Sequence, residues 1–374
     1  MSHVTRRSVL QHAAAGAAAT LIARPAPGQQ PPDEVLPDER RAMAAAADGF
    51  RNDFNIPGLS VAIARAGRLV YAAGFGTADS GLPVAPSHLF RIASVSKPIT
   101  SVAIFTLIEQ GRLRLSDRVF GQQGILAGQY GRRPYKPFVE DITIEHLLTH
   151  TCGGWQNDGR DPMFSNPQMN HAQLISWTLD NAPLTAQPGT KYAYSNFGYC
   201  VLGRVIEHVT RQRYGSYALS AVLNRCGIRD MRISGNTREQ RVPGEVAYYP
   251  DGNPYGMNVT RMDSHGGWIA TASDLVRFAT HVDGLAPERS ILQPETIRTM
   301  TTASNANSGY AKGWAVNPRN WWHNGSLPGT TSIMVRTGSG FCWAALANAR
   351  HLDSGGALDK LIWTMVGQVK AWKA

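Results

Sequence analysis

The sequence predicts an α+β fold, an antiparallel sheet flanked by helices with an inserted all-helical lobe, and two observations predict it. Apolar runs typical of strands gather near both ends of the 374-residue chain. The stretch between Leu115 and Arg261 instead shows helical segments and loops, with few such runs. A sheet built from both ends, with helices in between, indicates one catalytic unit of two lobes. We therefore expect a cleft at the seam between the lobes.

The first elements expected are a helix and a β-hairpin. Residues 39–54 have the apolar spacing of a helix. The apolar runs 59–64 and 69–73 are separated by Ala66 and Gly67. Two extended runs joined by so short a turn are typical of a hairpin, so the sheet starts early in the chain.

Three more strands and a last helix are expected near the carboxyl end. Strands are predicted at 321–323, 330–335 and 341–347, with a glycine-containing turn at 338–340 between the last two. Residues 357–371 are amphipathic and predict the closing helix.

The order of these elements predicts how the chain is divided. A single catalytic domain is expected over residues 39–374. Its α/β lobe is expected to combine 39–115 with 262–374, and its helical lobe to span 116–261.

Residues 1–30 have the features of a delivery signal. Arg6 and Arg7 precede a mild apolar run at 13–23, which prolines follow. This pattern predicts a twin-arginine-type export signal, with 31–38 as a linker, and hence a periplasmic or secreted protein. The apolar run is too short for a transmembrane segment, and no later run qualifies. A chance arginine pair on an unexported chain is the alternative, and the cleavage position stays open.

Composition excludes several classes of protein. Hydrophobic residues make up 43% of the chain and charged residues 17%, so a disordered polyelectrolyte or a coiled coil is excluded. The formal net charge is +10, but the cations are scattered, and Arg132, Arg133 and Lys136 are the densest interior group. Such scattering is typical of a solvated surface, so no nucleic-acid partner is expected.

No metal and no cofactor are expected. The four cysteines have irregular spacings and no C-x-x-C pair, and they are predicted to be small buried hydrophobes. His146 and His150 lie four residues apart, but no third ligand is near in sequence. Neither of the glycine-rich nucleotide-binding motifs occurs.

The first candidate motif is the S-x-x-K of Ser94 and Lys97, which opens an apolar-periodic helix ending near Leu113. A spacing of three places both side chains on one helical face, and Pro98 is tolerated in the first turn. A lysine whose pKa is lowered by burial can take the proton of a serine nucleophile. A serine cap followed by a surface lysine would give the same letters.

The second candidate motif is Tyr194, Ser195 and Asn196. It follows a Pro-Gly-Thr loop and leads into an apolar helical stretch, so it can lie at the edge of a cleft. A tyrosine there can relay a proton, and an asparagine can donate to and accept from a substrate amide. The alternative is a buried tyrosine beside a capping residue.

The third candidate motif is His323, Asn324, Gly325 and Ser326, at the end of a predicted edge strand. Glycine lets a backbone approach a ligand closely, and the N–H of Ser326 would then pair with that of Ser94 to hold an oxyanion. A tight turn with a solvated histidine is the alternative.

Taken together, the order S-x-x-K, Y-S-N and H-N-G resembles the serine β-lactamase and penicillin-binding protein superfamily. The branch it is similar to holds class C β-lactamases, D,D-carboxypeptidases, D-aminopeptidases and family VIII esterases. The resemblance covers most of residues 40–370. Linking segments that are also similar to that branch are Leu147 to Thr151, Pro188 to Thr190, Gly266 with Gly267, Thr271 to Leu275, and Gly313 with Trp314.

The resemblance implies a β-lactamase-like fold and a role for each motif residue. It implies that Ser94 is the nucleophile, Lys97 its base and Tyr194 the general acid and base. It implies that Asn196 contacts a substrate amide and that His323, Gly325 and Ser326 form the substrate-binding strand. No cofactor is implied.

The third motif departs from the class C pattern, because His323 stands where those enzymes have a lysine. A titratable imidazole attracts a carboxylate less than a permanent cation, so turnover of carboxylate-bearing β-lactams is less favoured. We therefore expect an exported serine hydrolase acting on a small-molecule or peptide acyl substrate, an ester or an amide, with peptidoglycan fragments among the candidates. The alternatives are a β-lactamase and a non-catalytic penicillin- or peptidoglycan-binding protein.

Overall fold

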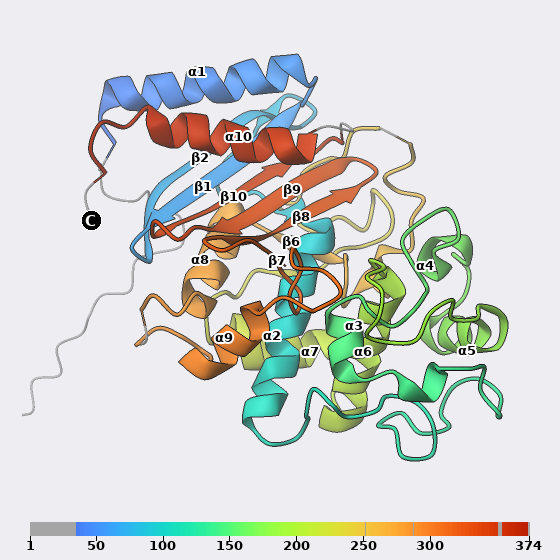
Figure 1. Cartoon of the computed structure of the whole chain (residues 1–374). Helices are drawn as coiled ribbons and strands as arrows, with labels where there is room; N and C mark the ends of the chain where they lie inside the picture. Colours follow the sequence, from blue (N-terminus) through green and yellow to red (C-terminus); the bar gives the residue numbers. More distant parts are fainter. Residues whose placement is uncertain (1–34, 251, 287, 351–353, 373–374) are drawn as a thin grey trace, which may run out of the picture.

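The strands from both ends of the chain meet in one antiparallel sheet (Figure 1). The computed structural model describes residues 35–250, 252–286, 288–350 and 354–372. Within these residues the sheet has seven strands in the order β3-β2-β1-β10-β9-β8-β7. Their bounds are β1 Gly58–Arg65, β2 Arg68–Asp79, β3 Leu82–Pro83, β7 Ala315–Val316, β8 Trp321–Leu327, β9 Thr330–Arg336 and β10 Phe341–Ala347.

The pairing of β1 with β10 joins the two ends of the chain, as the sequence predicts. The register runs from Leu59 opposite Ala347 to Arg65 opposite Phe341. The predicted hairpin is also confirmed, because β1 pairs with β2 through a two-residue turn. Both turn residues have positive φ, 47° at Ala66 and 75° at Gly67, which matches the right-handed twist of the strands.

Two helices from opposite ends of the chain cover one face of the sheet (Figure 1). They are α1, Pro37–Asp53, and α10, Ser354–Gly367. Their apolar side chains pack on alternate strand residues such as Val61 and Trp343. Both helices begin and end a few residues earlier than the sequence predicts. Helix α1 begins at Pro37, a residue that fits the first turn of a helix, and α10 ends at Gly367 rather than at 371.

The other face of the sheet packs against α8, Ala272–Val282, and the buried helix α2, Ser96–Glu109. Twelve of the fourteen residues of α2 are buried, as expected for a helix that is apolar around most of its circumference. The helix ends four residues before the predicted Leu113, since Gly111 takes a left-handed conformation with φ of 68°.

The middle of the chain forms the helical part of the molecule (Figure 1). It also supplies one short strand, β5, which joins a second sheet in the order β4-β6-β5. A strand of two residues leaves no periodic signal in a sequence. The remaining bounds are α3 Ile144–Leu148, α4 Pro162–Ser165, α5 His171–Asn181, α6 Asn196–Thr210, α7 Tyr214–Ala218, α9 Pro294–Thr301, β4 Phe90–Arg91, β5 Arg232–Ile233 and β6 Trp268–Ala270, with short turns η1 Ala93–Val95, η2 Val139–Asp141, η3 Leu219–Leu223 and η4 Val259–Met262.

Two further sequence predictions concern the cysteines and membrane-spanning segments. All four cysteines are buried free thiols, as predicted. Among the described residues no helix is long and apolar enough to cross a membrane. The predicted export signal lies outside the described residues.

Candidate active site

Ser94 lies in the turn η1, which delivers it to the amino-terminal end of α2. The residue before it, Ala93, has a positive φ of 47°, a conformation that costs an alanine energy unless its surroundings hold it. Two hydroxyl groups of β9 stabilise this conformation through hydrogen bonds to the preceding carbonyl groups. Thr330 Oγ1 donates to the carbonyl of Arg91 at 2.9 Å, and Ser332 Oγ donates to that of Ile92 at 2.7 Å.

Lys97 is fully buried one helical turn after Ser94, and its Nζ lies 3.0 Å from Ser94 Oγ. The same nitrogen donates to Asn196 Oδ1 at 2.8 Å and to the carbonyl of His265 at 3.2 Å. Burial lowers the pKa of Lys97 to about 7, against an opposing effect of the Asp161 charge. A neutral amine has two N–H groups and one lone pair. Because the two oxygens can only accept, the lone pair is left for Ser94.

Tyr194 contacts both Ser94 and Lys97. Its phenol makes a hydrogen-bonding contact with Ser94, and its ring centroid is 4.7 Å from Lys97 Nζ. Burial raises the pKa of Tyr194 well above its ordinary value, so the phenol is neutral and keeps a proton to give. The first two sequence motifs are therefore brought together around Ser94.

Asn196, the first residue of α6, is engaged at every polar atom. Its Oδ1 accepts from Lys97, and its Nδ2 donates to Asn157 Oδ1 at 3.1 Å and to Asp161 Oδ2 at 2.9 Å. A carboxamide nitrogen has two N–H groups, and both are used here. The side chain that the sequence assigns to a substrate amide thus has no free donor in this arrangement.

His323 is buried, and it ends a directed series of hydrogen bonds. The backbone N–H of Ser195 donates to His150 Nδ1, so His150 Nε2 carries the proton and donates to Tyr310 Oη at 3.1 Å. Tyr310 then donates to His323 Nε2 at 3.1 Å, and His323 Nδ1 donates to the carbonyl of Asn324 at 2.7 Å.

These hydrogen bonds engage both ring nitrogens of His323, and they fit a neutral imidazole. Burial lowers its pKa to about 3, and the nearby charge of Lys97 acts in the same direction. The imidazole therefore supplies no cation to the site at neutral pH.

Gly325 and Ser326 lie on the stretch of β8 that runs past Ser94 and the turn η1. The two-residue strand β7 pairs only with Trp321 and Trp322, so it leaves this part of the β8 edge uncovered. A side chain at Gly325 would overlap the carbonyl oxygen of Ile92 and the hydroxyl of Ser332. Glycine thus allows β8 to lie against η1, and it places Ser326 at the pocket.

Gly325→Ala is expected to lower both stability and activity. The added methyl group must push β8 away from η1, which costs about 1–3 kcal/mol of overpacking and displaces Ser326 from Ser94. Denaturant unfolding and kcat/KM measure the two effects. Gly356→Ala, at an exposed position of α10 where nothing lies within 4 Å of the added methyl group, is the control and should be neutral or stabilising. If Gly325→Ala had the stability and the kcat/KM of the wild type, the close approach of β8 to η1 would be contradicted.

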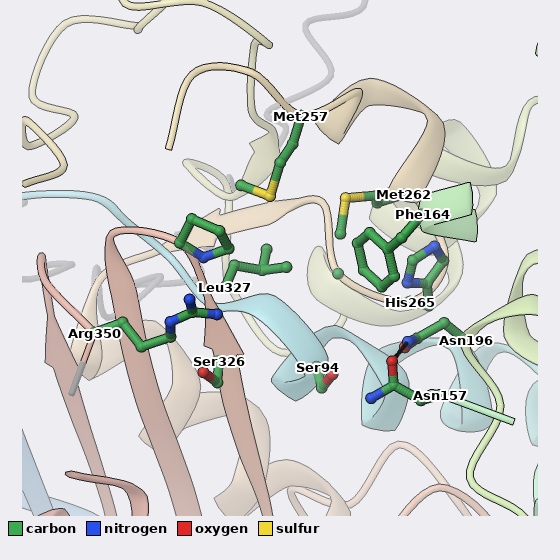
Figure 2. Close-up of a pocket in the computed structure, with 12 residues that line it drawn as sticks. Ser94, Asn157, Phe164, Asn196, Met257, Met262, His265, Ser326, Leu327 and Arg350 are labelled. Atoms are coloured by element: carbon green, nitrogen blue, oxygen red, sulfur yellow. Dashed lines mark hydrogen bonds between the residues drawn. The ribbon is translucent and has the colours of Figure 1, made fainter. Parts of the chain in front are cut away.

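A cavity of about 460 Å³ opens beside Ser94. Figure 2 shows Ser94 at its centre, with Asn157 and Asn196 on one side and Ser326 and Arg350 on the other. Much of the rest of the wall is apolar. The lining residues are Ser94, Asn157, Phe164, Asn196, Met257, Met262, His265, Gly266, Ser326, Leu327, Pro328 and Arg350.

Several residues in and around the site escape sequence reasoning. Asp161 has one usable signal, because an aspartate directly before Pro162 is typical of a helix start, and it does cap α4. Asn157, Tyr310 and His265 stand in no motif. Tertiary contacts alone bring them to Ser94. No group of His, Cys, Asp and Glu side chains that could hold a metal ion occurs in the described part of the chain.

Comparison with known proteins agrees with this geometry. The family model described as Beta-lactamase matches residues 40–364. Esterase EstB of Burkholderia gladioli is 29% identical over 63% of this chain and 62% of its own length. Penicillin-binding protein 4 of Amycolatopsis lactamdurans is 26% identical over 80% of this chain and 83% of its own. The chain thus spans less than two thirds of EstB, and 57% of another curated relative.

Among solved structures, the fold is similar to D-amino acid amidase from Ochrobactrum anthropi SV3, in its complex with D-phenylalanine. The TM-score is 0.72 at 21% identity, over 88% of this chain and 99% of that one. At this level of identity the likeness supports the fold.

Proposed function

The chain belongs to the β-lactamase family, and we propose from this premise that it is a serine hydrolase acting through an acyl-enzyme on Ser94. The observation that carries the proposal is the buried Lys97, whose Nζ lies 3.0 Å from the Ser94 hydroxyl at the wall of the pocket and is hydrogen-bonded to two further oxygens. Tyr194 lies within hydrogen-bonding reach of the same hydroxyl.

In the proposed acylation step, neutral Lys97 takes the proton of Ser94 as Oγ attacks the substrate carbonyl carbon. The backbone N–H groups of Ser94 and Ser326, which border the same pocket, hold the negative oxygen that forms. Tyr194 gives its proton to the leaving oxygen or nitrogen and is reprotonated from Lys97. Water then attacks the acyl-enzyme, and the acid product leaves with Ser94 restored.

For the substrate, we propose a carboxylic ester with an apolar acyl group. Phe164, Met257, Met262 and Leu327 offer such a group an apolar wall beside Ser94. The neutral state of His323 removes one attraction for a carboxylate. Similarity to an esterase, EstB, supports the same choice.

One observation favours a second candidate, a substrate that bears a carboxylate. The guanidinium of Arg350 lines the pocket across from Asn157 (Figure 2). A guanidinium is suited to bind a carboxylate, such as that of a penicillin or of a peptide ending in a D-amino acid. Similarity to penicillin-binding protein 4 supports this candidate.

The two candidates are separated by a substrate panel of p-nitrophenyl butyrate, D-alanine p-nitroanilide and benzylpenicillin. We expect the butyrate ester to give the highest kcat/KM and benzylpenicillin the lowest turnover, because Phe164, Met257, Met262 and Leu327 line the pocket that holds Ser94. Faster turnover of benzylpenicillin, which alone of the three bears a carboxylate, would favour the second candidate. No hydrolysis and no covalent adduct with any of them, by intact mass, would contradict the hydrolase.

Export is a further part of the proposal. The arginine pair at Arg6 and Arg7, followed by a short apolar run, supports export through a twin-arginine-type signal. Recovery of the unprocessed chain from the cytoplasm alone would contradict it.

A further inference from the structure

A buried carboxylate, Asp161, lies behind the residues that hold Lys97. Its side chain is fully buried, and both of its oxygens already accept a hydrogen bond. Oδ1 accepts from the backbone N–H of Met163 at 2.9 Å and so caps α4. Oδ2 accepts from Asn196 Nδ2 at 2.9 Å. Burial raises the pKa of Asp161, and the hydrogen bonds together with the charge of Lys97 oppose this rise.

These acceptors give the Asn196 carboxamide a single workable orientation. Its nitrogen faces two oxygens, Asp161 Oδ2 and Asn157 Oδ1, and its oxygen faces the amine of Lys97. In the flipped orientation the carboxamide oxygen would face the carboxylate. Its N–H groups would then face Lys97, where they would compete with Ser94 for the amine lone pair.

The same orientation decides what Asn157 presents to the pocket. Because Asn157 Oδ1 accepts from Asn196, its Nδ2 must point elsewhere. Figure 2 shows this nitrogen on the side that faces Ser94, in the wall of the cavity. Asn157 therefore offers the donor that Asn196 lacks.

We propose that Asp161 is a positioning residue whose carboxylate turns the Asn196 oxygen toward Lys97, so that the lysine lone pair stays on Ser94 and Asn157, in place of Asn196, donates to the acyl part of the substrate. This inference rests on the proposed function of Ser94 and Lys97. It adds a polar chain, Asp161 to Asn196 to Lys97, that joins the loop before α4 to the nucleophile.

The charge of Asp161 should also affect how the activity depends on pH, through the pKa of Lys97. The carboxylate raises the pKa of Lys97 against the larger effect of burial. Removing the charge should therefore lower the pKa of Lys97 further. The other titratable groups around Lys97 are histidines and tyrosines that burial keeps neutral: His150, His265, His323, Tyr194 and Tyr199.

Two variants of Asp161 test the positioning role. Asp161→Asn keeps the shape but can accept only one of the two hydrogen bonds, so Asn196 is expected to flip. Asp161→Ser can still cap α4 but is too short to reach Asn196. For both we expect kcat for p-nitrophenyl butyrate to fall about 10²-fold with KM little changed, as for a misplaced catalytic group. We also expect the acidic limb of the kcat/KM profile to move to lower pH.

Asp158→Asn is the matched control, since it removes the same charge from an exposed aspartate of the same loop that binds Gln156 and Arg160. It should leave kcat and the acidic limb unchanged. If the Asp161 variants only unfolded α4, activity would fall but the acidic limb of the kcat/KM profile would stay in place, and the positioning role would be contradicted. If both Asp161 variants kept the kcat of the wild type and the acidic limb at its wild-type pH, the positioning role would be overturned.

Asn157→Ala tests the donor. It should raise KM about fivefold for an N-acetyl-amino-acid ester, whose acetamide carbonyl can accept from Asn157 Nδ2, and raise KM less for the butyrate ester, which has no second carbonyl. An equal change for both esters would overturn the assignment of Asn157.

A neutron crystal structure of Asp161→Asn, which distinguishes the nitrogen of a carboxamide from its oxygen, keeps this inference separate from the proposed function. If Ser94→Ala is inactive while Asn196 Oδ1 stays on Lys97 in Asp161→Asn, only the positioning role fails. If Ser94→Ala is fully active, the proposed function fails, and the orientation of Asn196 in the variant still decides whether Asp161 sets it.

Discussion

Ser94→Ala is expected to lower kcat for any substrate of this protein by about 10⁶-fold, the scale on which subtilisin responds to the loss of its serine nucleophile. The change removes the hydroxyl that both Lys97 and Tyr194 contact. Intact mass after exposure to p-nitrophenyl butyrate should show an acyl adduct on the wild type and none on the variant. Steady-state kinetics measure the loss.

The fold should survive this change, because Ser94 is small, partly exposed and contributes no core packing. Ser101→Ala, in the helix α2 that follows Ser94, is a matched control. Its hydroxyl donates to the carbonyl of Lys312, away from the pocket, so it should keep its activity while losing a little stability. Hydrolysis by Ser94→Ala at the wild-type rate, or an adduct on it, would exclude Ser94 as the nucleophile.

Lys97→Met is expected to lower kcat/KM by about 10²- to 10⁴-fold, the usual contribution of a general base. In the wild type, burial brings the pKa of Lys97 from its ordinary 10.5 to about 7. Below that pH the amine is protonated and has no lone pair, so kcat/KM should fall as the pH drops through about 7 and level off above it. The variant has no titrating amine, and its residual activity should lose this limb.

Lys312→Met provides the comparison for this variant, because Lys312 is also buried but pairs with Glu145 at 3.2 Å, and it does not line the pocket. It should retain the acidic limb and most of the activity. An unchanged limb in Lys97→Met would mean that another group titrates there, and Lys97 would no longer be the base.

Much of the fold was accessible from apolar patterns. The hairpin over β1 and β2, the strand Phe341–Ala347 and the two flanking helices follow from runs that lie wholly within one segment. Strand β5 was not accessible, because its two residues are fixed by pairing with β6, far along the chain. The end of α2 depends on the left-handed conformation of Gly111.

The sequence by itself determined the parts of the site that lie within a few residues of each other. Ser94 and Lys97 meet because a helix brings residues three apart onto one face. Tyr194 and Asn196 reach the same point because a loop ends there and α6 begins. Gly325 is readable as a place where the backbone must come close.

The tertiary structure alone decided the direction of each hydrogen bond and the charge of each group. Asn157 and Asp161 come from a separate loop, and they turn Asn196 away from the substrate. Tyr310 closes the chain that keeps His323 neutral. Local spacing follows from helix geometry, which a short segment carries with it. Orientation and pKa depend instead on the donors, acceptors and charges that distant segments contribute, and on the water that packing excludes.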